Sequence, residues 1–162
     1  MADTKVAILM GSQSDFETVK EAVDILKQFN VACEAKVLSA HRTPKEVEEY
    51  VVTAQTSGVK VFIAAAGGSA ALAGVVASHT TLPVIGIPME TASLKGMDSL
   101  LSTVQMPAGI PVAAMAIGKA GAKNAGLFAV AILAVSDDDL AAKLLAYRSL
   151  MREKILKTKL EI

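Results

Sequence analysis

The chain has 162 residues, of which 52% are hydrophobic and 20% are charged, with 16 basic and 16 acidic side chains. This length is typical of a single domain. The balanced charge argues against a basic surface for nucleic acid or for anionic membranes. The apolar excess in so short a chain predicts burial in a homo-oligomer.

A reducing, cytoplasmic environment is expected from the cysteine content and from the N-terminal segment. Cys33 is the single cysteine, so an intrachain disulfide is excluded. We interpret it as a buried structural thiol; the alternative is a nucleophile. The N-terminal segment lacks the long apolar region of a secretory signal. The apolar stretches at 110–117 and 125–135 are too short and too interrupted to span a bilayer.

The first half of the chain alternates apolar runs with segments of helical spacing. The run at 6–10 ends at Gly11, which predicts a buried parallel strand. Apolar residues at helical spacing then predict a helix from about Asp15 to Phe29. The same criteria predict strands at 31–38, 59–65 and 82–87, a helix at 44–57, and a helix that follows Gly67-Gly68 and ends near His79.

The second half is predicted to contain one strand and two helices. The strand is expected at 111–115, and a long helix of small apolar residues at 119–135. That helix is apolar almost all round, so it must be buried either in the core or against other subunits. The last helix begins at 137–139 with three aspartates and ends in a basic tail at 152–159, interpreted as a solvated helix end. Strands alternating with helices predict one α/β domain over 1–162, with helices on both faces of a parallel sheet.

Ligands in such sheets bind beyond the carboxyl ends of the strands, so the loops there are the candidate site. After the first strand, Gly11 permits a sharp turn, and the hydroxyls of Ser12 and Ser14 with the following helix N-terminus form an anion site. Asp15 is suited to accept hydrogen bonds from ribose hydroxyls. The alternative is that Ser14 or Asp15 only caps the helix.

The loop after the second strand contains Ser39-Ala40-His41-Arg42-Thr43-Pro44. Arg42 is suited to bind phosphate through two parallel hydrogen bonds. His41 has the side-chain type that exchanges a proton near neutral pH, so we interpret it as an acid/base group. Thr43 is expected only to cap the next helix.

The loop after the third strand contains Gly67-Gly68, which permits close approach of the backbone to a ligand. Ser69 either bonds the ligand or caps the helix. The three loops are expected to lie side by side, which brings phosphate, ribose and proton-transfer groups to one pocket. His79 is interpreted as a surface residue, and the two histidines lack the spacing of metal ligands, so no metal site is expected.

These loops, together with later segments, resemble the 5-(carboxyamino)imidazole ribonucleotide mutase (PurE) family of purine biosynthesis. The matching segments, in the order of the family, are 11–15, 39–44, 82–88, 98–100, 104–107 and 117–125. The resemblance implies a flavodoxin-like three-layer α/β/α sandwich that assembles into an octamer with its active site at subunit contacts. The C-terminal helix at about 137–160 is expected to pack on a neighbouring subunit.

The implied reaction moves a carboxylate from N5 of the imidazole ribotide to C4 by decarboxylation and recarboxylation, without metal, nucleotide cofactor or ATP. His41 matches the general acid and base of the family, and Ser12, Asp15 and Arg42 match positions that hold phosphate and ribose. The full set of expected substrate-binding residues is Gly11, Ser12, Ser14, Asp15, Ser39, Ala40, Arg42, Gly67, Gly68, Ser69, Ala70 and Leu72.

One loop departs from the pattern of the mutases. Their second histidine and their proline correspond to Ala71 and Ala73 in this chain. Ser69, Ala71 and Leu72 resemble the related carboxylases, which add CO2 directly to aminoimidazole ribotide, whereas Arg42 and Pro44 resemble the mutases. Three hypotheses follow: the mutase, the direct carboxylase, and a non-catalytic or divergent ribotide-binding relative.

Overall fold

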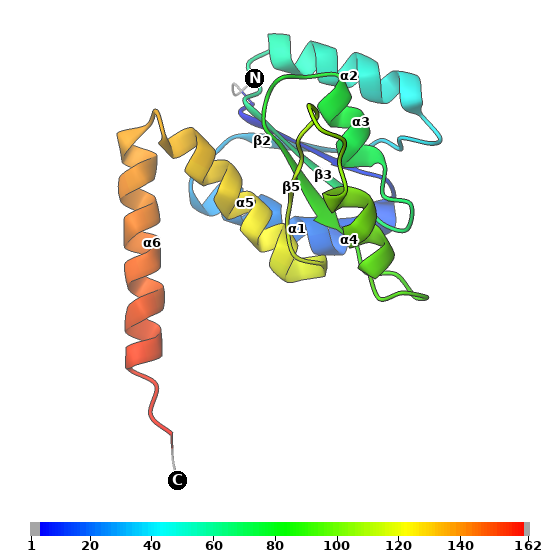
Figure 1. The fold of residues 1–162 in the computed structure, drawn as a ribbon. Coiled ribbons are helices and arrows are strands. Elements are labelled where there is room, and N and C mark those ends of the chain that lie inside the picture. The colour runs from blue at the N-terminus through cyan, green and yellow to red at the C-terminus, as the bar shows by residue number, and fades with distance from the viewer. Residues whose placement is uncertain (1–3, 161–162) are drawn as a thin grey trace.

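A five-stranded parallel sheet forms the centre of the computed structural model, which describes residues 4–160 (Figure 1). The strand order is β2-β1-β3-β4-β5. The strands are β1 (Val6–Met10), β2 (Cys33–Val37), β3 (Val61–Ala66), β4 (Val84–Pro88) and β5 (Ala113–Ala114). The helices are α1 (Phe16–Gln28), α2 (Pro44–Thr56), α3 (Leu72–Ser78), α4 (Met97–Val104), α5 (Gly118–Ala134) and α6 (Asp138–Leu156), with a one-turn 3-10 helix η1 (Gln13–Asp15) before α1.

The register of the strands brings three loops to one edge of the sheet. Met10, the last residue of β1, pairs with Val37 on one side and Ala65 on the other. Parallel strands all run toward the same edge, so the segments that follow β1, β2 and β3 leave the sheet next to one another. The predicted α/β sandwich is therefore confirmed, together with the adjacency of the three loops.

The two faces of the sheet bury different side chains. Ile8 and Ile63 face α1 and α5, whereas Leu9 and Phe62 face α2 and α3. β1 and most of β3 are buried on both faces, which explains their continuous apolar sequence. This core holds the strand ends, and with them the loops, in fixed positions.

Helix α4 was not predicted from the sequence. Its buried residues are Ser99 and Thr103, whereas Met97, Leu101 and Val104 are exposed. The helix therefore presents hydroxyl groups inward and apolar groups outward, which is the reverse of the usual helical pattern. Apolar periodicity could not reveal a helix whose inner face is polar.

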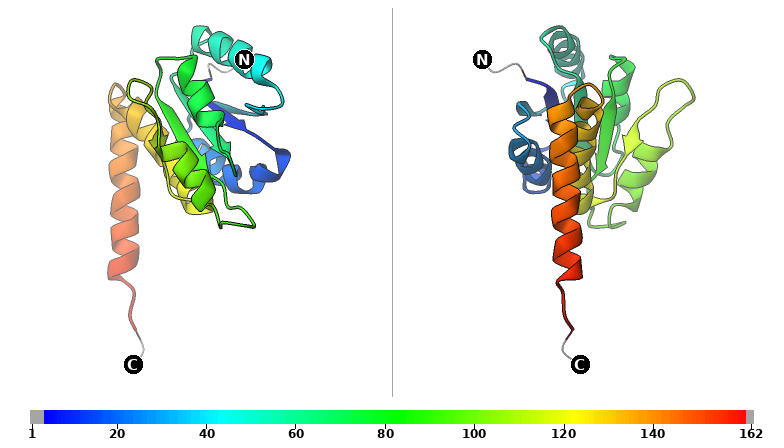
Figure 2. Two further views of the ribbon diagram at one scale, coloured as in Figure 1. Left: turned by 45° about the vertical axis from the view of Figure 1, so that its right-hand side comes forward. Right: turned by 90° about the vertical axis from the view of Figure 1, so that its left-hand side faces the viewer.

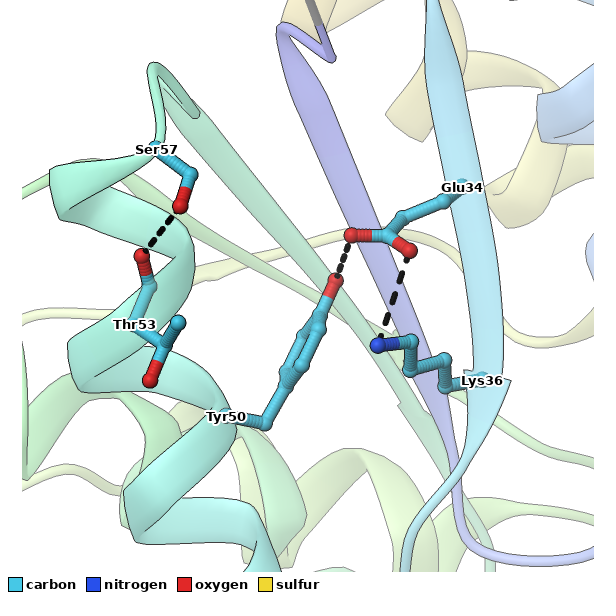
Figure 3. Close-up of polar contacts among 5 residues, drawn as sticks. All are labelled: Glu34, Lys36, Tyr50, Thr53 and Ser57. Carbon is cyan, nitrogen blue, oxygen red and sulfur yellow. Dashed lines mark hydrogen bonds and ion pairs between the residues drawn. The ribbon is translucent and has the colours of Figure 1, made fainter. Parts of the chain in front are cut away.

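β2 is an edge strand, and it is less buried than its sequence suggested. Cys33 is only partly buried, and desolvation raises the pKa of its thiol. Along the same strand, Glu34 accepts a hydrogen bond of 2.8 Å from the Tyr50 hydroxyl of α2 and pairs with Lys36 at 3.6 Å (Figure 3). Burial and the bond to Glu34 raise the pKa of Tyr50, so this hydroxyl remains a donor that ties β2 to α2.

The last two helices differ in how far they are covered. α5 buries one face, formed by small residues such as Ala122 and Ala129, against the rest of the chain. Phe128, which is also on α5, is exposed. α6 packs on α5 at its start and extends away from the sheet (Figure 2). Leu140 is the one residue of α6 that is buried. Within residues 4–160, no helix is both long enough and apolar enough to cross a membrane.

Candidate functional site

The three loops enclose one cavity of about 430 Å³ at the carboxyl edge of the sheet. Eleven of the predicted site residues line it: Gly11, Ser12, Asp15, Ser39, Ala40, His41, Arg42, Gly67, Ser69, Ala70 and Leu72. Ala66 and Ala71 complete the lining, whereas Ser14 and Gly68 are not part of it. A cavity of this size falls in the range of small-molecule sites.

The loop after β1 is shaped by Ser12, which the sequence did not identify as a cap. Its side chain accepts a hydrogen bond of 3.3 Å from the Ser14 N–H, and its own N–H donates to the Asp15 carboxylate at 3.2 Å. These reciprocal bonds form a capping box around η1. The alternative that Ser14 or Asp15 only caps the helix holds in part: the Asp15 carboxylate belongs to this capping box, but it forms no side-chain cap bond to α1, and Asp15 also lines the cavity.

Asp15 lies partly buried in the cavity, and its environment acts on its charge in two directions. Desolvation raises the pKa of the Asp15 carboxyl group, and this effect outweighs three others that lower it. The opposing effects are the hydrogen bonds from Ser12 and Ser14 and the positive charge of Arg42. Burial therefore disfavours the ionised form of Asp15, and hydrogen-bond donors around the carboxylate favour that form.

Arg42 joins the second loop to the first. Its Nη2 donates to the Gly11 carbonyl oxygen at 2.6 Å, and its Nε donates to Ser39 Oγ at 3.3 Å. The side chain is exposed at the cavity, so other guanidinium N–H groups remain available to an anion. This arrangement places a fixed positive charge beside Ser12.

Thr43 shapes the second loop in a way that differs from the prediction. It occupies the N-cap position of α2, but its side chain forms no bond to that helix. Instead its hydroxyl accepts from the Ser39 N–H at 2.8 Å and donates to the Ser39 carbonyl oxygen at 3.1 Å. Thr43 therefore closes the loop on itself and holds His41 on an exposed turn that lines the cavity.

The third loop forms a wall of small residues. Ser69 lines the cavity, and the N-cap of α3 is Ala71, which has no capping side chain, so the alternative that Ser69 caps this helix is wrong. Gly68 adopts a φ of +69°, in the left-handed region that favours glycine. Its backbone is bonded to Ser99 and Ser102 of α4. Ser99 lies in the family-matching segment 98–100, but the sequence indicated no role for either serine.

The second histidine lies apart from this constellation. His79 is the C-cap residue of α3 and is partly buried rather than fully exposed. It does not line the cavity, so His41 is the one imidazole among the cavity-lining residues. The site thus combines a guanidinium, three loop hydroxyls, a carboxylate and an imidazole, which suits an anionic, hydroxylated ligand that undergoes proton transfer.

Comparison with known proteins gives consistent matches over nearly the whole chain. The profile of the AIR carboxylase family (AIRC) matches residues 5–154. The N5-carboxyaminoimidazole ribonucleotide mutase of Bacillus subtilis is 56% identical over 153 residues, which cover 94% of each chain. The enzyme of the same name from Saccharolobus solfataricus is 53% identical over 97% of this chain and 98% of its own. The crystal structure of Treponema denticola PurE superposes with a TM-score of 0.86 at 30% identity, covering 94% of each chain.

Proposed function

The chain belongs to the AIR carboxylase family, and on that premise we propose that it is an N5-carboxyaminoimidazole ribonucleotide mutase, an isomerase of purine biosynthesis. One observation supports this function above the others. A guanidinium, a carboxylate and an imidazole, from Arg42, Asp15 and His41, line one cavity of ribotide size. Relatives that are more than half identical over nearly their full length have the mutase name.

The proposed roles follow from the chemistry of each group. Arg42 and Ser12 bind the phosphate, and Asp15 accepts hydrogen bonds from ribose hydroxyls, which donate to a carboxylate that burial has left poorly solvated. Gly67 lets the backbone approach the ligand. The apolar wall at 70–72 excludes water from the released CO2.

His41 moves the protons of the reaction. The bond between N5 and the carboxylate carbon breaks, CO2 departs, and N5 receives a proton from the imidazolium. C4 of the ring then attacks the retained CO2, and the imidazole removes the proton that C4 carries. The net result is one proton moved from C4 to N5, with His41 restored, so no metal, nucleotide cofactor or ATP is required.

Ala71 is the residue at which this chain departs from the sequence pattern of the mutases. It lines the cavity at the start of α3, where the mutases have a histidine. The resemblance of this loop to the direct carboxylases makes that activity the second candidate. The test is to offer purified protein the N5-carboxylated ribotide, and separately aminoimidazole ribotide with CO2, with the His41→Asn variant prepared identically as a control for host enzyme. Turnover of the second substrate alone contradicts the mutase.

The proposed assembly is a homo-octamer in the cytoplasm, with the active site at subunit contacts and α6 on a neighbouring subunit. Three observations support it. α6 extends away from the domain (Figure 2). Leu145, Leu150 and Ile155 of this helix are exposed, and His41 is exposed in the single chain. Light scattering should give about 134 kDa, eight times the 16.8-kDa chain. A monomeric mass for fully active protein contradicts the assembly.

A further inference from the structure

Two serine hydroxyls of α4 hold both polar backbone groups of Gly68. The Gly68 N–H donates to Ser99 Oγ at 3.0 Å. Ser102 Oγ shares its one hydrogen between the Gly68 carbonyl oxygen at 3.2 Å and the Asp98 carbonyl oxygen of its own helix at 2.8 Å. The two bonds to Gly68 join positions 31 and 34 residues apart in the sequence. None of the cavity-lining residues comes from α4, so these bonds link the helix to the cavity through a residue of the third loop.

The segment that these serines hold has few hydrogen bonds of its own. Ala70 N–H donates to the Gly68 carbonyl oxygen at 2.8 Å, and Ala71 N–H donates to the Ser69 carbonyl oxygen at 2.6 Å. Both bonds close three-residue turns, which are weaker constraints than helical bonds. Because the Gly68 carbonyl accepts from Ala70 and also from Ser102, a shift of this peptide moves the wall formed by Ser69, Ala70 and Ala71.

The hydroxyl of Ser99 is enclosed by the core rather than by water. Ser99 is 0% exposed, and a Cβ built on the neighbouring Gly67 would lie 3.4 Å from Met89 Cβ and 3.8 Å from Ser99 Oγ. The glycine pair therefore rests closely on α4 and on the end of β4. Loss of the Ser99 hydroxyl leaves the Gly68 N–H without this acceptor, which costs more than a bond exchanged with solvent.

We propose that Ser99 and Ser102 are positioning residues of the reaction: through the Gly68 peptide they fix the wall at 69–71 in the geometry that receives the substrate. Neither side chain lines the cavity. The inference rests on the proposed function, because it assumes that the ribotide occupies this cavity.

The test uses full-length Ser99→Ala and Ser102→Ala, with Thr103→Val as the matched control. Thr103 is also a buried hydroxyl of α4, but it donates to the Ser99 carbonyl oxygen within the helix and not to the loop. We expect KM for the N5-carboxylated ribotide to rise about fivefold in each serine variant, with a smaller change in kcat, as for one hydrogen bond worth about 1 kcal/mol. Thr103→Val should lower thermal stability without this rise. Ser102→Thr, which keeps the hydroxyl at an exposed position, should retain the KM of the wild type.

A second readout does not depend on activity. Hydrogen exchange of the peptide that spans 66–72 in the free protein should be faster in the serine variants than in Thr103→Val and wild type. If the wild-type protein turns over neither ribotide, the proposed function is contradicted. The exchange data then test by themselves whether Ser99 and Ser102 position the loop. Unchanged KM and exchange in Ser102→Ala, or an equal effect of Thr103→Val, overturn the inference, and Ser102→Ala decides if Ser99→Ala does not fold.

Discussion

Arg42 donates a hydrogen bond of 2.6 Å from its Nη2 to the carbonyl oxygen of Gly11, which joins the loop after β2 to the loop after β1. The bond, which lies within the chain itself, places a guanidinium in the same cavity wall as Ser12 and Asp15. A binding group that is already fixed loses less conformational freedom when the ligand arrives. Phosphate binding in the proposed function therefore depends on the shape of the side chain as well as on its charge.

Arg42→Lys tests this dependence on shape. Lysine keeps the positive charge but lacks the planar fork that reaches Gly11 and Ser39 together. We expect KM for the ribotide to rise about tenfold, because hydrogen bonds to a charged group contribute about 1.5–3 kcal/mol. Steady-state kinetics provide the measurement, with Arg152→Lys on the exposed part of α6 as the control. Equal KM values in Arg42→Lys and wild type would show that charge alone suffices.

His41→Asn separates proton transfer from binding. Asparagine keeps a polar side chain at the cavity but cannot exchange a proton near neutral pH. We expect kcat to fall about 10²- to 10⁴-fold, the usual contribution of a general acid/base, while calorimetry still detects ribotide binding. His79→Asn, at the C-cap of α3 and away from the cavity, should keep normal turnover. Loss of binding together with turnover in His41→Asn would contradict the assigned role.

Ala71→His restores the side chain that the resemblance predicts at this position. The new imidazole would enter a cavity of about 430 Å³ and supply a donor to the migrating carboxylate. We expect kcat/KM of the mutase reaction to rise about tenfold, in line with one hydrogen bond to a charged group. Ala71→Leu fills the space without a donor and serves as the control. Equal gains in both variants would mean that filled volume, and not the donor, limits the reaction.

Asp15→Asn is expected to change the pH dependence of stability. Burial raises the folded-state pKa of Asp15 above its unfolded value, so the folded protein binds this proton more tightly. The protonated Asp15 carboxyl group makes its full contribution to the free energy of unfolding below about pH 3.9. This contribution is lost as the pH rises through the raised pKa. Asparagine keeps an acceptor for the Ser12 N–H but does not titrate.

The difference in unfolding free energy, wild type minus Asp15→Asn, should therefore fall with rising pH across that window and then level off. Urea unfolding at a series of pH values measures it. In the same variant, ribotide binding at neutral pH should weaken, because a neutral amide accepts from ribose hydroxyls less strongly than a carboxylate. Parallel stability curves for the two proteins would refute the effect of burial on Asp15.

Gly126→Ala tests the packing of α5 on α1. A Cβ at this position would lie 2.9 Å from the Ala22 carbonyl oxygen and 3.0 Å from Ile25 Cβ, so the two helices must separate. We expect a loss of about 1–3 kcal/mol in stability, which exceeds the gain of about 1 kcal/mol from the better helix former. Gly74→Ala in α3 is the control, because its new Cβ would meet only the flexible end of Met106. Thermal unfolding should show no loss in Gly74→Ala.

Much of the candidate site could be predicted because it depends on strand ends. Continuous apolar runs that stop at Gly11 or before Gly67 mark buried strands, and parallel strands end at one edge of the sheet. The proximity of polar residues that follow such strands can therefore be predicted without further information about the fold. For this reason the sequence alone predicts that His41 and Arg42 lie beside Asp15.

The sequence by itself determined the α/β class, the order of the strands and of every helix except α4 and η1, and the residue types at the carboxyl edge, because each of these follows from local apolar spacing and turn residues. Only the tertiary structure decided what the hydroxyl groups bind. Ser12 caps η1, Thr43 bonds back to Ser39, and Ser99 crosses 31 residues to hold Gly68. The same local sequence allows a serine or threonine hydroxyl to bond either its own backbone or a distant loop. Its partner is therefore fixed only when packing brings one acceptor or donor within reach.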